Sequence, residues 1–319
     1  MKWIACLFLL IQLPGFAQNR LSLTSVTDKV NLLPATFINT SHSERDFALS
    51  PDGSELFYTI QTQKGVFQTL LHSKKLSNGS WTNPTIASFA GNYSDLEPAF
   101  SADGKKLYFA SNRPINGSEP KDFDIWVVEK KNGVWGSPTN LGPTVNSSQD
   151  EFYPSIAASG NLYFTAAYTR GIGKEDIYMA RFIQGSFEQP EPLDTSVNSK
   201  MYEFNAFVSQ DEKYILFTAY GRKDDMGGGD LYLSEKGSDG KWKPARHLPQ
   251  LNSNRLDYCP FISFDSKILF FTSERSNLKD SYKGQPVKTS ELNQLLNSPL
   301  NGGGNIYWIK FSSILDWLK

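Results

Sequence analysis

The chain has 319 residues, of which 39% are hydrophobic and 13% aromatic, so it can bury a sizeable apolar core. Its 32 basic and 33 acidic residues leave a net charge of −1, which argues against nucleic acid as the main partner. Of the two cysteines, Cys6 falls in the N-terminal leader, so Cys259 would be alone in the mature chain. We therefore predict no intrachain disulfide, with Cys259 as a small apolar core residue.

Residues 1–17 have the features of a secretory signal peptide. Lys2 supplies a positive charge, residues 3–13 form a short apolar run, and Gly15-Phe16-Ala17 offers small residues for cleavage. The apolar run is too short to span a bilayer, and no later segment is long enough. We expect cleavage after Ala17 and export of a soluble protein to the periplasm or beyond, with no transmembrane segment.

A short segment recurs five times at a nearly constant interval. In its best-formed copy, Glu97–Ser111, a Ser-Ala-Asp-Gly turn separates Ala-Phe from Leu-Tyr-Phe. Asp-Gly between two apolar runs indicates a β-hairpin, because glycine accepts the positive φ of the turn. Equivalent turns begin at residues 50, 101, 157, 209 and 263, so the steps are 51, 56, 52 and 54 residues. A period of this size is typical of repeat arrays and propellers.

Two further pieces follow the hairpin in most units. The first is a short strand opened by a polar residue, as in Asp124-Ile125-Trp126. The second is an aromatic residue followed two or three residues later by proline, as in Trp135…Pro138. Proline fits an edge strand, where its missing N–H would face solvent. The units span about residues 44–94, 95–149, 150–201, 202–255 and 256–311.

The fifth unit lacks the aromatic-proline piece. A last blade with three strands would leave an open edge, which closed all-β folds avoid. Near the N-terminus, residues 30–34 resemble the segment 140–143 that ends the second unit. We therefore predict an all-β, single-domain five-bladed β-propeller over residues 18–319, closed by an N-terminal strand that joins the last blade. Six blades remain an alternative if residues 18–45 form more than one strand.

The segment 98–113, followed by Asp124-Ile125-Trp126, resembles the TolB-type, WD-like β-propeller repeat of exported bacterial proteins. The resemblance spans about residues 44–311. It implies the fold and a place in the cell envelope, but it assigns no activity, because such propellers serve as binding modules, scaffolds and parts of enzymes. The third unit lacks the turn aspartate, and Glu212 and Ser266 replace the turn glycine in the last two, so the turn geometry there stays open.

An acidic residue lies six positions before each turn. In a propeller these equivalent positions meet around one mouth of the central channel. Like charges so close together need cations, N–H donors or raised pKa values. The ring could bind a metal ion or a cationic ligand, or it could staple neighbouring blades, and its repetition in every unit favours the staples. The five residues are Glu44, Asp95, Glu151, Glu203 and Asp257.

An arginine follows the second strand in four units and precedes the polar residue that opens the third strand. A guanidinium fork suits a carboxylate, so we predict structural pairs within blades. The predicted pairs are Arg113–Asp124, Arg170–Asp176 and Arg222–Asp230. In the fifth unit Asn305 replaces the aspartate, which would leave Arg275 free for a ligand.

Two other features are candidates for recognition. Most aromatic residues occupy repeated strand positions and are expected in the core, but four tyrosines near the channel end could stack on a ligand: Tyr168, Tyr202, Tyr220 and Tyr258. The fifth unit also carries an insertion, residues 276–304, with helix-forming character around Thr289–Leu296. It is either a recognition loop or a lid over a blade face.

Common enzyme signatures are missing from the sequence. It contains neither G-x-S-x-G nor H-E-x-x-H, and His42, His72 and His247 lie in different units. The sequence favours a non-catalytic, monomeric binding or scaffold module with an envelope protein or a glycan as partner. We expect no cofactor apart from a cation that the acidic ring could hold. The alternative is a carbohydrate-active enzyme that uses two channel-mouth carboxylates, as glycoside hydrolases do.

Overall fold

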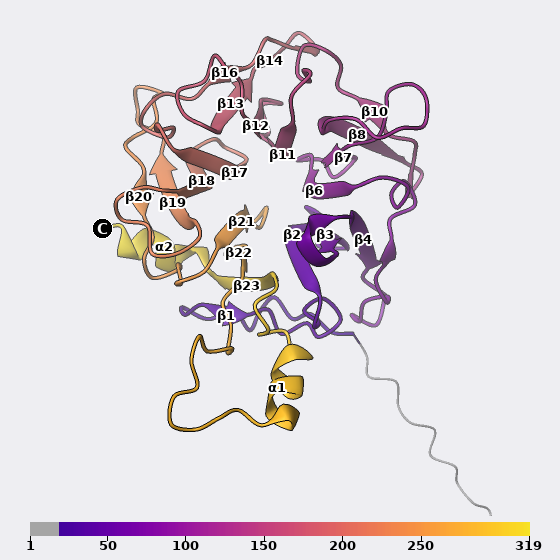
Figure 1. Cartoon of the computed structure of the whole chain (residues 1–319). Coiled ribbons are helices and arrows are strands. Elements are labelled where there is room, and N and C mark those ends of the chain that lie inside the picture. The colour runs from indigo at the N-terminus through magenta and orange to yellow at the C-terminus, as the bar shows by residue number, and fades with distance from the viewer. Residues whose placement is uncertain (1–18) are drawn as a thin grey trace, which may run out of the picture.

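Five antiparallel sheets surround a common centre in the computed structural model, which describes residues 19–319 (Figure 1). The predicted signal peptide lies outside the described residues. In each sheet the strand nearest the centre comes first along the chain, except that the last sheet is completed from the N-terminal side. The chain is therefore a five-bladed β-propeller, as the sequence predicts, and the six-bladed alternative is wrong.

The first two blades follow each other along the chain. Blade 1 consists of β2 (Ser43–Leu49), β3 (Glu55–Gln61), β4 (Gln68–Lys74) and β5 (Thr85–Ile86). Blade 2 consists of β6 (Asp95–Phe100), β7 (Lys106–Ser111), β8 (Asp124–Lys131) and β10 (Thr139–Asn140), with β9 (Val134–Trp135) paired to β8. A 3-10 turn, Gln63–Gly65, connects β3 to β4.

The other three blades complete the ring. Blade 3 has β11 (Glu151–Ile156), β12 (Leu162–Ala166), β13 (Asp176–Ala180) and β16 (Glu191–Pro192), with a hairpin of β14 (Phe182–Ile183) and β15 (Ser186–Phe187). Blade 4 has β17 (Tyr202–Val208), β18 (Tyr214–Tyr220), β19 (Asp230–Glu235) and β20 (Arg246–His247). Blade 5 has β21 (Asp257–Ile262), β22 (Ile268–Ser273), β23 (Asn305–Lys310) and β1 (Asn31–Leu32).

The N-terminal strand closes the ring, as predicted. Strand β1 pairs antiparallel with β23, with Asn31 opposite Trp308 and Leu32 opposite Tyr307. The Asn39 amide then holds both backbone groups of Ile306, accepting from its N–H at 2.8 Å and donating to its carbonyl at 3.1 Å. Asn146, Asn198 and Asn252 make the same two bonds in blades 2 to 4, but to residues only 21 positions away. In blade 5 the asparagine that bonds to the third strand thus comes from the N-terminal segment, whereas in blades 2 to 4 it comes from the loop that follows the blade.

The hairpin turns keep one geometry in all five blades. The residue at the glycine position has a positive φ throughout, from 53° to 90°, in Gly53, Gly104, Gly160, Glu212 and Ser266. A serine hydroxyl bonded to the turn aspartate fixes four of these turns, as Ser263 does with Asp265 at 2.7 Å. Glu212 and Ser266 therefore adopt a left-handed backbone that favours glycine.

The core lies between the blades, where the second strands are covered on both faces. In β3, for example, Leu56 and Phe57 have no exposed surface and Tyr58 is 2% exposed. Aromatic rings pack edge to face across the seam between blades 1 and 2, with Phe57 and Trp135 5.8 Å apart. Such packing makes the ring a rigid support for the loops at its two ends.

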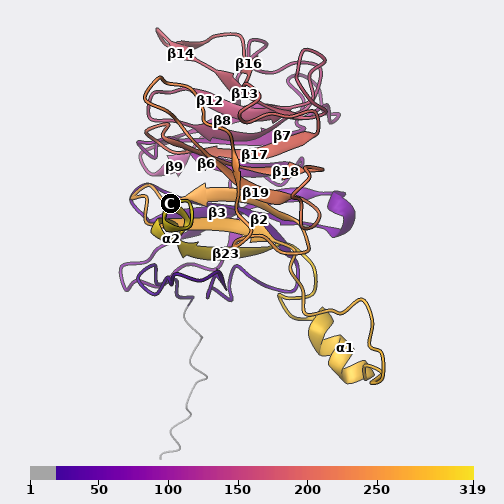
Figure 2. The same cartoon turned by 90° about the vertical axis from the view of Figure 1, so that its left-hand side faces the viewer.

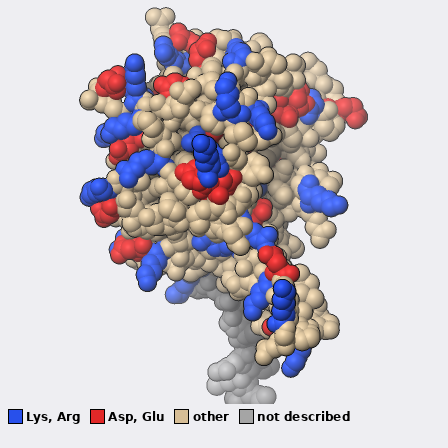
Figure 3. Space-filling model, turned by 60° about the vertical axis from the view of Figure 1, so that its left-hand side comes forward, with Lys and Arg blue, Asp and Glu red and all other residues tan. Residues whose placement is uncertain are grey.

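The two helices lie outside the blades. Helix α1 (Thr289–Leu296) belongs to the insertion, has no buried residue, and projects away from the ring in both views (Figures 1 and 2). Helix α2 (Phe311–Trp317) follows β23 and buries Phe311 and Ile314 against the core. On the face in Figure 3, acidic and basic side chains are interspersed over the blades. Within residues 19–319, no helix is long and apolar enough to cross a membrane.

Candidate functional site

The five acids of the predicted ring hold the loops that enter their own blades. Each is at most 1% exposed. Each carboxylate accepts a hydrogen bond from the backbone N–H four residues earlier, and a hydroxyl on that residue adds a second bond in four blades. In blade 4, for example, Glu203 accepts from Ser199 N–H at 2.7 Å and from its hydroxyl at 2.6 Å. These carboxylates are engaged by the protein's own donors.

Three of the four arginines pair with these ring acids and not with the aspartates of the third strands. Arg113 lies 2.6 Å from Asp95, and Arg222 lies 2.8 Å from Glu203. The predicted pairs Arg113–Asp124 and Arg222–Asp230 are therefore wrong. The guanidinium of Arg222 lies over the Phe217 and Tyr232 rings, which directs it toward the inner strand.

The third-strand aspartates already have local donors. Asp124 contacts Lys121 and Asn140, and Asp230 accepts from Met226 N–H and contacts His247. Asp176 accepts from the N–H groups of Ile172 and Gly173. The predicted Arg170–Asp176 pair is wrong as well, because Arg170 donates to Pro190 O at 2.9 Å. In blade 3 the hydroxyl of Tyr168 replaces the guanidinium and donates to Glu151 at 2.5 Å.

Arg275 is not free for a ligand. Its guanidinium pairs with Asp257 at 2.8 Å, donates to Leu251 O at 2.6 Å and lies 4.6 Å from the centre of the Tyr307 ring. Asn305 does stand where the other units have an aspartate, but Arg275 does not need a carboxylate on the third strand, because it pairs with Asp257 on the inner strand. The ring acid on the inner strand is its partner in blades 2, 4 and 5.

Burial shapes the ionisation of the ring. It raises the pKa of Glu151 to about 7, and it raises the pKa of Asp95 although Arg113 opposes the shift. Among residues 19–319, no group of three or more His, Cys, Asp or Glu side chains is arranged to hold a metal ion.

A β-bulge lies two residues beyond each ring acid. The pairing of the first two strands shifts register at this point in every blade. The bulged residues are all buried and have φ between 50° and 62°: Asp46, Glu97, Tyr153, Asn205 and Cys259. None is glycine, so each residue is strained by about 1 kcal/mol or more. Bulges are common beside functional sites, where they redirect side chains.

The bulged residues build a polar network across the channel, which we call the waist. Glu97 contacts three other blades: its carboxylate lies 2.8 Å from Arg45, accepts Tyr153 N–H at 2.7 Å and accepts the Asn205 amide at 3.3 Å. Arg45 also pairs with Asp46 at 2.8 Å. Burial raises the pKa of Glu97, and Arg45 opposes that shift.

Threonines on the second strands explain why Glu97 is needed there. The hydroxyls of Thr59, Thr165 and Thr272 accept the N–H of the bulged residue in the next blade, at 3.1 to 3.3 Å. Blade 2 has Ala110 at the equivalent place, paired with Leu96 as Thr165 is with Phe152. The Tyr153 N–H therefore lacks a hydroxyl and donates to Glu97 instead.

A bowl of about 280 Å³ lies on one side of the waist, at the end of the propeller where the inner strands begin. Its wall comes mainly from two repeated positions: the residue after each ring acid and the residue before each third strand. Backbone bonds tie the second position to the ring acid of the next blade, since Glu151 N–H donates to Phe123 O at 2.8 Å and Glu203 N–H to Glu175 O at 3.0 Å. The bowl is lined by Arg45, Gln68, Leu96, Glu97, Phe123, Phe152, Thr165, Glu175, Phe204, Asn205, Leu256 and Tyr258.

The lining of the bowl combines aromatic rings with polar and charged groups. Blades 2 to 4 contribute three half-buried phenylalanines, Phe123, Phe152 and Phe204, and the first two rings lie 4.9 Å apart. Blades 1 and 5 contribute Gln68, Arg45 and Tyr258, with the Arg45 guanidinium 5.1 Å from the centre of the Tyr258 ring.

Glycines occupy the position before the third strand in blades 4 and 5. A Cβ at Gly304 would lie 2.9 Å from the Tyr258 hydroxyl oxygen and 3.1 Å from Glu44 O. Gly304 O also accepts the Glu44 N–H at 2.8 Å. At Gly229 the Leu256 side chain lies as close, 2.8 Å from the place that a Cβ would take. Neighbouring residues therefore leave no room for a side chain at this position in blades 4 and 5, and among the described residues the wall bears side chains there in blades 1 to 3.

Glu175 is the unpaired acid of the bowl. Its side chain is half-buried and makes no ion pair or hydrogen bond within residues 19–319. Burial, together with the negative charges of Asp150 and Asp176, raises its pKa to about 7.

Of the four predicted tyrosines, only Tyr258 reaches the bowl. Tyr168 is engaged by Glu151 and lines a separate hollow of about 220 Å³. Tyr202 and Tyr220 lie with ring centres 6.0 Å apart, and neither lines the bowl. Sequence reasoning missed Glu97, Glu175 and the three phenylalanines. The signal available was a polar or aromatic residue that differs from blade to blade at an otherwise repeated position.

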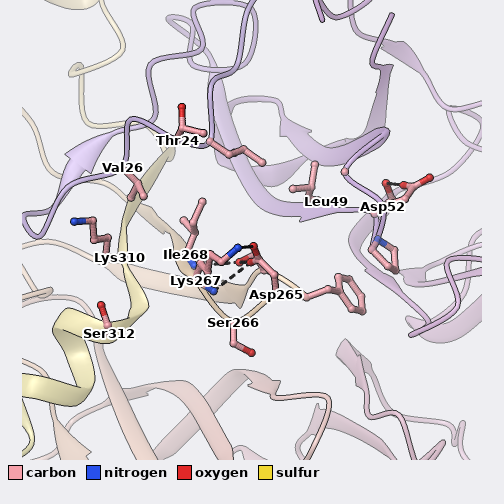
Figure 4. Close-up of a pocket in the computed structure, with 16 residues that line it drawn as sticks. Thr24, Val26, Leu49, Asp52, Asp265, Ser266, Lys267, Ile268, Lys310 and Ser312 are labelled. Carbon is pink, nitrogen blue, oxygen red and sulfur yellow. Dashed lines mark hydrogen bonds and ion pairs between the residues drawn. The ribbon is translucent and has the colours of Figure 1, made fainter. Parts of the chain in front are cut away.

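A larger hollow, about 740 Å³, lies on the turn side between blades 1 and 5 (Figure 4). Its charged side chains already have partners: Asp52 bonds to Ser50 and Ser54, and Asp265 pairs with Lys267 at 3.0 Å. Lys310 pairs with Asp28 at 3.2 Å. This hollow is a seam between the N-terminal segment and the turns, and its polar groups serve the turn geometry.

Comparisons with known proteins support the fold and leave the activity open. No family model matches the chain, and no curated protein matches it in sequence. TolB from Acinetobacter baumannii is a similar structure, with 17% identity and a TM-score of 0.48 over 74% of this chain, which spans about half (50%) of that protein's length. Putative TolB from Agrobacterium tumefaciens has 14% identity and a TM-score of 0.49, over 85% of this chain and 91% of the other.

An enzyme structure is also among those similar to this chain. An alpha-L-arabinofuranosidase from Lactobacillus brevis has 14% identity and a TM-score of 0.49, over 86% of this chain and 91% of the other. At such identities the likeness concerns the fold alone. The sheet topology itself shows that the chain is a five-bladed β-propeller, and structures described as TolB, the resemblance predicted from the repeats, are among those similar to it.

Proposed function

We propose that this protein is an exported, monomeric binding module of the cell envelope, and that its bowl receives a protruding group of a protein or glycan partner. The observation that carries the proposal is the set of three half-buried phenylalanines lining a hollow of about 280 Å³. Partly exposed aromatic rings in a concave site, with a few polar groups among them, are typical of ligand pockets. The rigid ring holds them in place without a ligand.

The size of the bowl limits what can enter. Ligand pockets usually measure about 300 to 1,000 Å³, so this one accepts one side chain or one sugar unit. Beyond it lies the waist, where Glu97 bonds to Arg45 of blade 1 and to Asn205 of blade 4 and so stands in the path of a longer chain. The rest of a partner would therefore rest on the surrounding loops, which suits recognition of a surface projection.

The test is capture of a partner from an envelope extract and binding to a glycan array, with two matched variants. Phe204→Ala removes a ring from the bowl, and Phe182→Ala removes one from the exposed β14–β15 hairpin. We expect a protein or glycan that the wild type and Phe182→Ala retain and that folded Phe204→Ala loses. Equal retention by both variants, or no specific ligand at all, would refute the proposal.

Glycoside hydrolysis is the second candidate, because Glu97 and Glu175 both line the bowl and both have raised pKa values. Two carboxyl groups, one of them protonated near neutral pH, are what such chemistry requires. Release of nitrophenol from a panel of aryl glycosides tests it. Turnover that Glu175→Gln abolishes, without a change in unfolding temperature, would replace binding by catalysis; we expect no turnover.

A further inference from the structure

We propose that the group entering the bowl is a cation, an ammonium or guanidinium at the end of a flexible chain, which lies between the Glu175 carboxylate and the faces of the phenylalanine rings. This inference rests on the proposed function and specifies its ligand. It follows from the charges around the bowl, from the aromatic wall and from the fit.

The charge around Glu175 is uncompensated. The groups that act on its carboxyl are Asp150 and Asp176, both negative, and no cation of residues 19–319 contacts it. The neighbouring Lys174 is exposed and lies over the Tyr202 ring, 4.9 Å from its centre. An entering cation would supply the missing partner, whereas an anion would meet repulsion.

Among residues 19–319, the only cation lining the bowl is Arg45, and it is already neutralised. Arg45 contacts Asp46 and Glu97, both at 2.8 Å, so two carboxylates face one guanidinium at the waist. Glu274, whose burial raises its pKa, adds a further acid that interacts electrostatically with Arg45. The bowl therefore carries an excess of negative charge once Glu175 ionises, and it has no free positive charge to attract an acidic ligand.

The aromatic wall completes a cation site. Phe123 and Phe152 form a ring pair that lines the same bowl as Glu175, and Phe204 belongs to the next blade, whose inner strand is bonded to Glu175 O. A ring face attracts a cation within about 6 Å by its quadrupole, with more effect where water is excluded. The same protein already uses this contact inside the bowl, where Arg45 lies over Tyr258. A neutral sugar would gain from the rings but would not relieve the Glu175 charge.

The ammonium could belong to a lysine side chain of a partner or to a free organic cation, and the probes separate these sources. Titrations by isothermal calorimetry or NMR would use n-butylammonium, choline and the peptide acetyl-Gly-Lys-Gly-amide. Butanol and the norleucine analogue of the peptide serve as uncharged matches of the same length. We expect the charged member of each pair to bind at least about tenfold more tightly, since 1.4 kcal/mol corresponds to that factor.

Variants of the full chain locate the effect. Glu175→Gln keeps the shape of the side chain and should weaken n-butylammonium by about tenfold, which is the 1.4 kcal/mol of one modest charge contact. Glu191→Gln, an exposed substitution in the same blade, should leave it unchanged. Phe152→Leu keeps an apolar side chain without a π face and should weaken the cation several-fold while leaving butanol unaffected. A tighter peptide points to a protein partner, and tighter choline to a small organic cation.

Two results would overturn the inference. One is equal binding of charged and uncharged probes, and the other is unchanged n-butylammonium binding in Glu175→Gln. If a partner is captured through Phe204 but Glu175→Gln still retains it and n-butylammonium does not compete, the binding function stands and the cation is wrong. If capture is indifferent to Phe204, the binding function fails even where n-butylammonium binds.

Discussion

Adjacent residues on the inner strands have opposite roles. The ring position is acidic in every blade, and its carboxylates serve the protein's own backbone, with Glu203 as the fullest case. The next position carries four different residue types in the five blades, and all five side chains line the bowl: Arg45, Leu96, Phe152, Phe204 and Tyr258. In a repeat protein, sameness between units therefore marks structure, and difference at an equivalent position marks the surface open to a ligand.

The largest effect expected from this comparison is a loss in the free energy of unfolding when an acid of the acidic ring is replaced. Glu203 accepts from Ser199 and Arg222, so Glu203→Ala leaves the half-buried Arg222 guanidinium without a carboxylate, although it keeps its bond to Val197 O, and removes the acceptor of the Ser199 N–H and hydroxyl. We expect a loss of about 3 kcal/mol in the free energy of unfolding, measured by denaturant titration. Any partner that binds wild type should bind the folded fraction of this variant with unchanged affinity.

The matched change is one residue away. Phe204→Ala should lower the free energy of unfolding by only about 1 to 2 kcal/mol, because that ring is half-buried, yet it should abolish partner binding. If Glu203→Ala lost binding without losing stability, or Phe204→Ala proved the more destabilising of the two, the division between ring and bowl would be wrong.

A smaller effect concerns pH. The pKa of Glu175 is about 7 in the folded protein and near 4.5 in the unfolded chain, so the folded state holds a proton that the unfolded state loses. The stability that this proton gives is complete below pH 4.5 and is lost as pH rises to 7. Its size is on the order of 2 kcal/mol after allowance for partial exposure.

Denaturant titrations at pH 5 and pH 8 measure this contribution. Other buried acids, such as Glu151, add slopes of the same sign, so the comparison is between wild type and Glu175→Gln. The variant should lose about 2 kcal/mol less over this interval, whereas Glu191→Gln should behave as wild type. An identical loss in Glu175→Gln would mean that burial does not raise the pKa of this carboxyl.

Much of the fold could be predicted from the sequence because the residues that determine each blade recur from unit to unit. The turn at each hairpin, the polar start of each third strand and the missing outer strand of unit five determined five blades and their closure by residues 31 and 32. The closure of the propeller by a strand distant in sequence was predictable, because the exposed edge of the last blade needs a strand from elsewhere in the chain to pair with it.

The candidate site was less predictable, because its residues do not repeat. Glu175 occupies a position where other blades have Gln68, Phe123, Gly229 and Gly304, so no pattern marks it. The bulge at Glu97 requires a positive φ, but the sequence has no glycine at this position that would indicate it. Arginine pairing failed for a related reason: sequence order suggested the next acid along the chain, whereas the nearest carboxylate lay on the preceding inner strand, 18 residues back for Arg275.

The smallest expected effect is at the hairpin turns, and it tests whether a repeated position has the same role in every blade. Ser266 has φ 57° at a position where three blades have glycine, and its side chain is exposed without a hydrogen bond to residues 19–319. Ser266→Gly should therefore raise the free energy of unfolding by about 1 kcal/mol. Glu212→Gly relieves the same strain but removes the carboxylate that accepts from Tyr163 at 2.8 Å and Asn161 at 3.0 Å. We expect the second variant to gain nothing by denaturant titration, and equal gains in both would show that the Glu212 contacts between blades do not stabilise the ring.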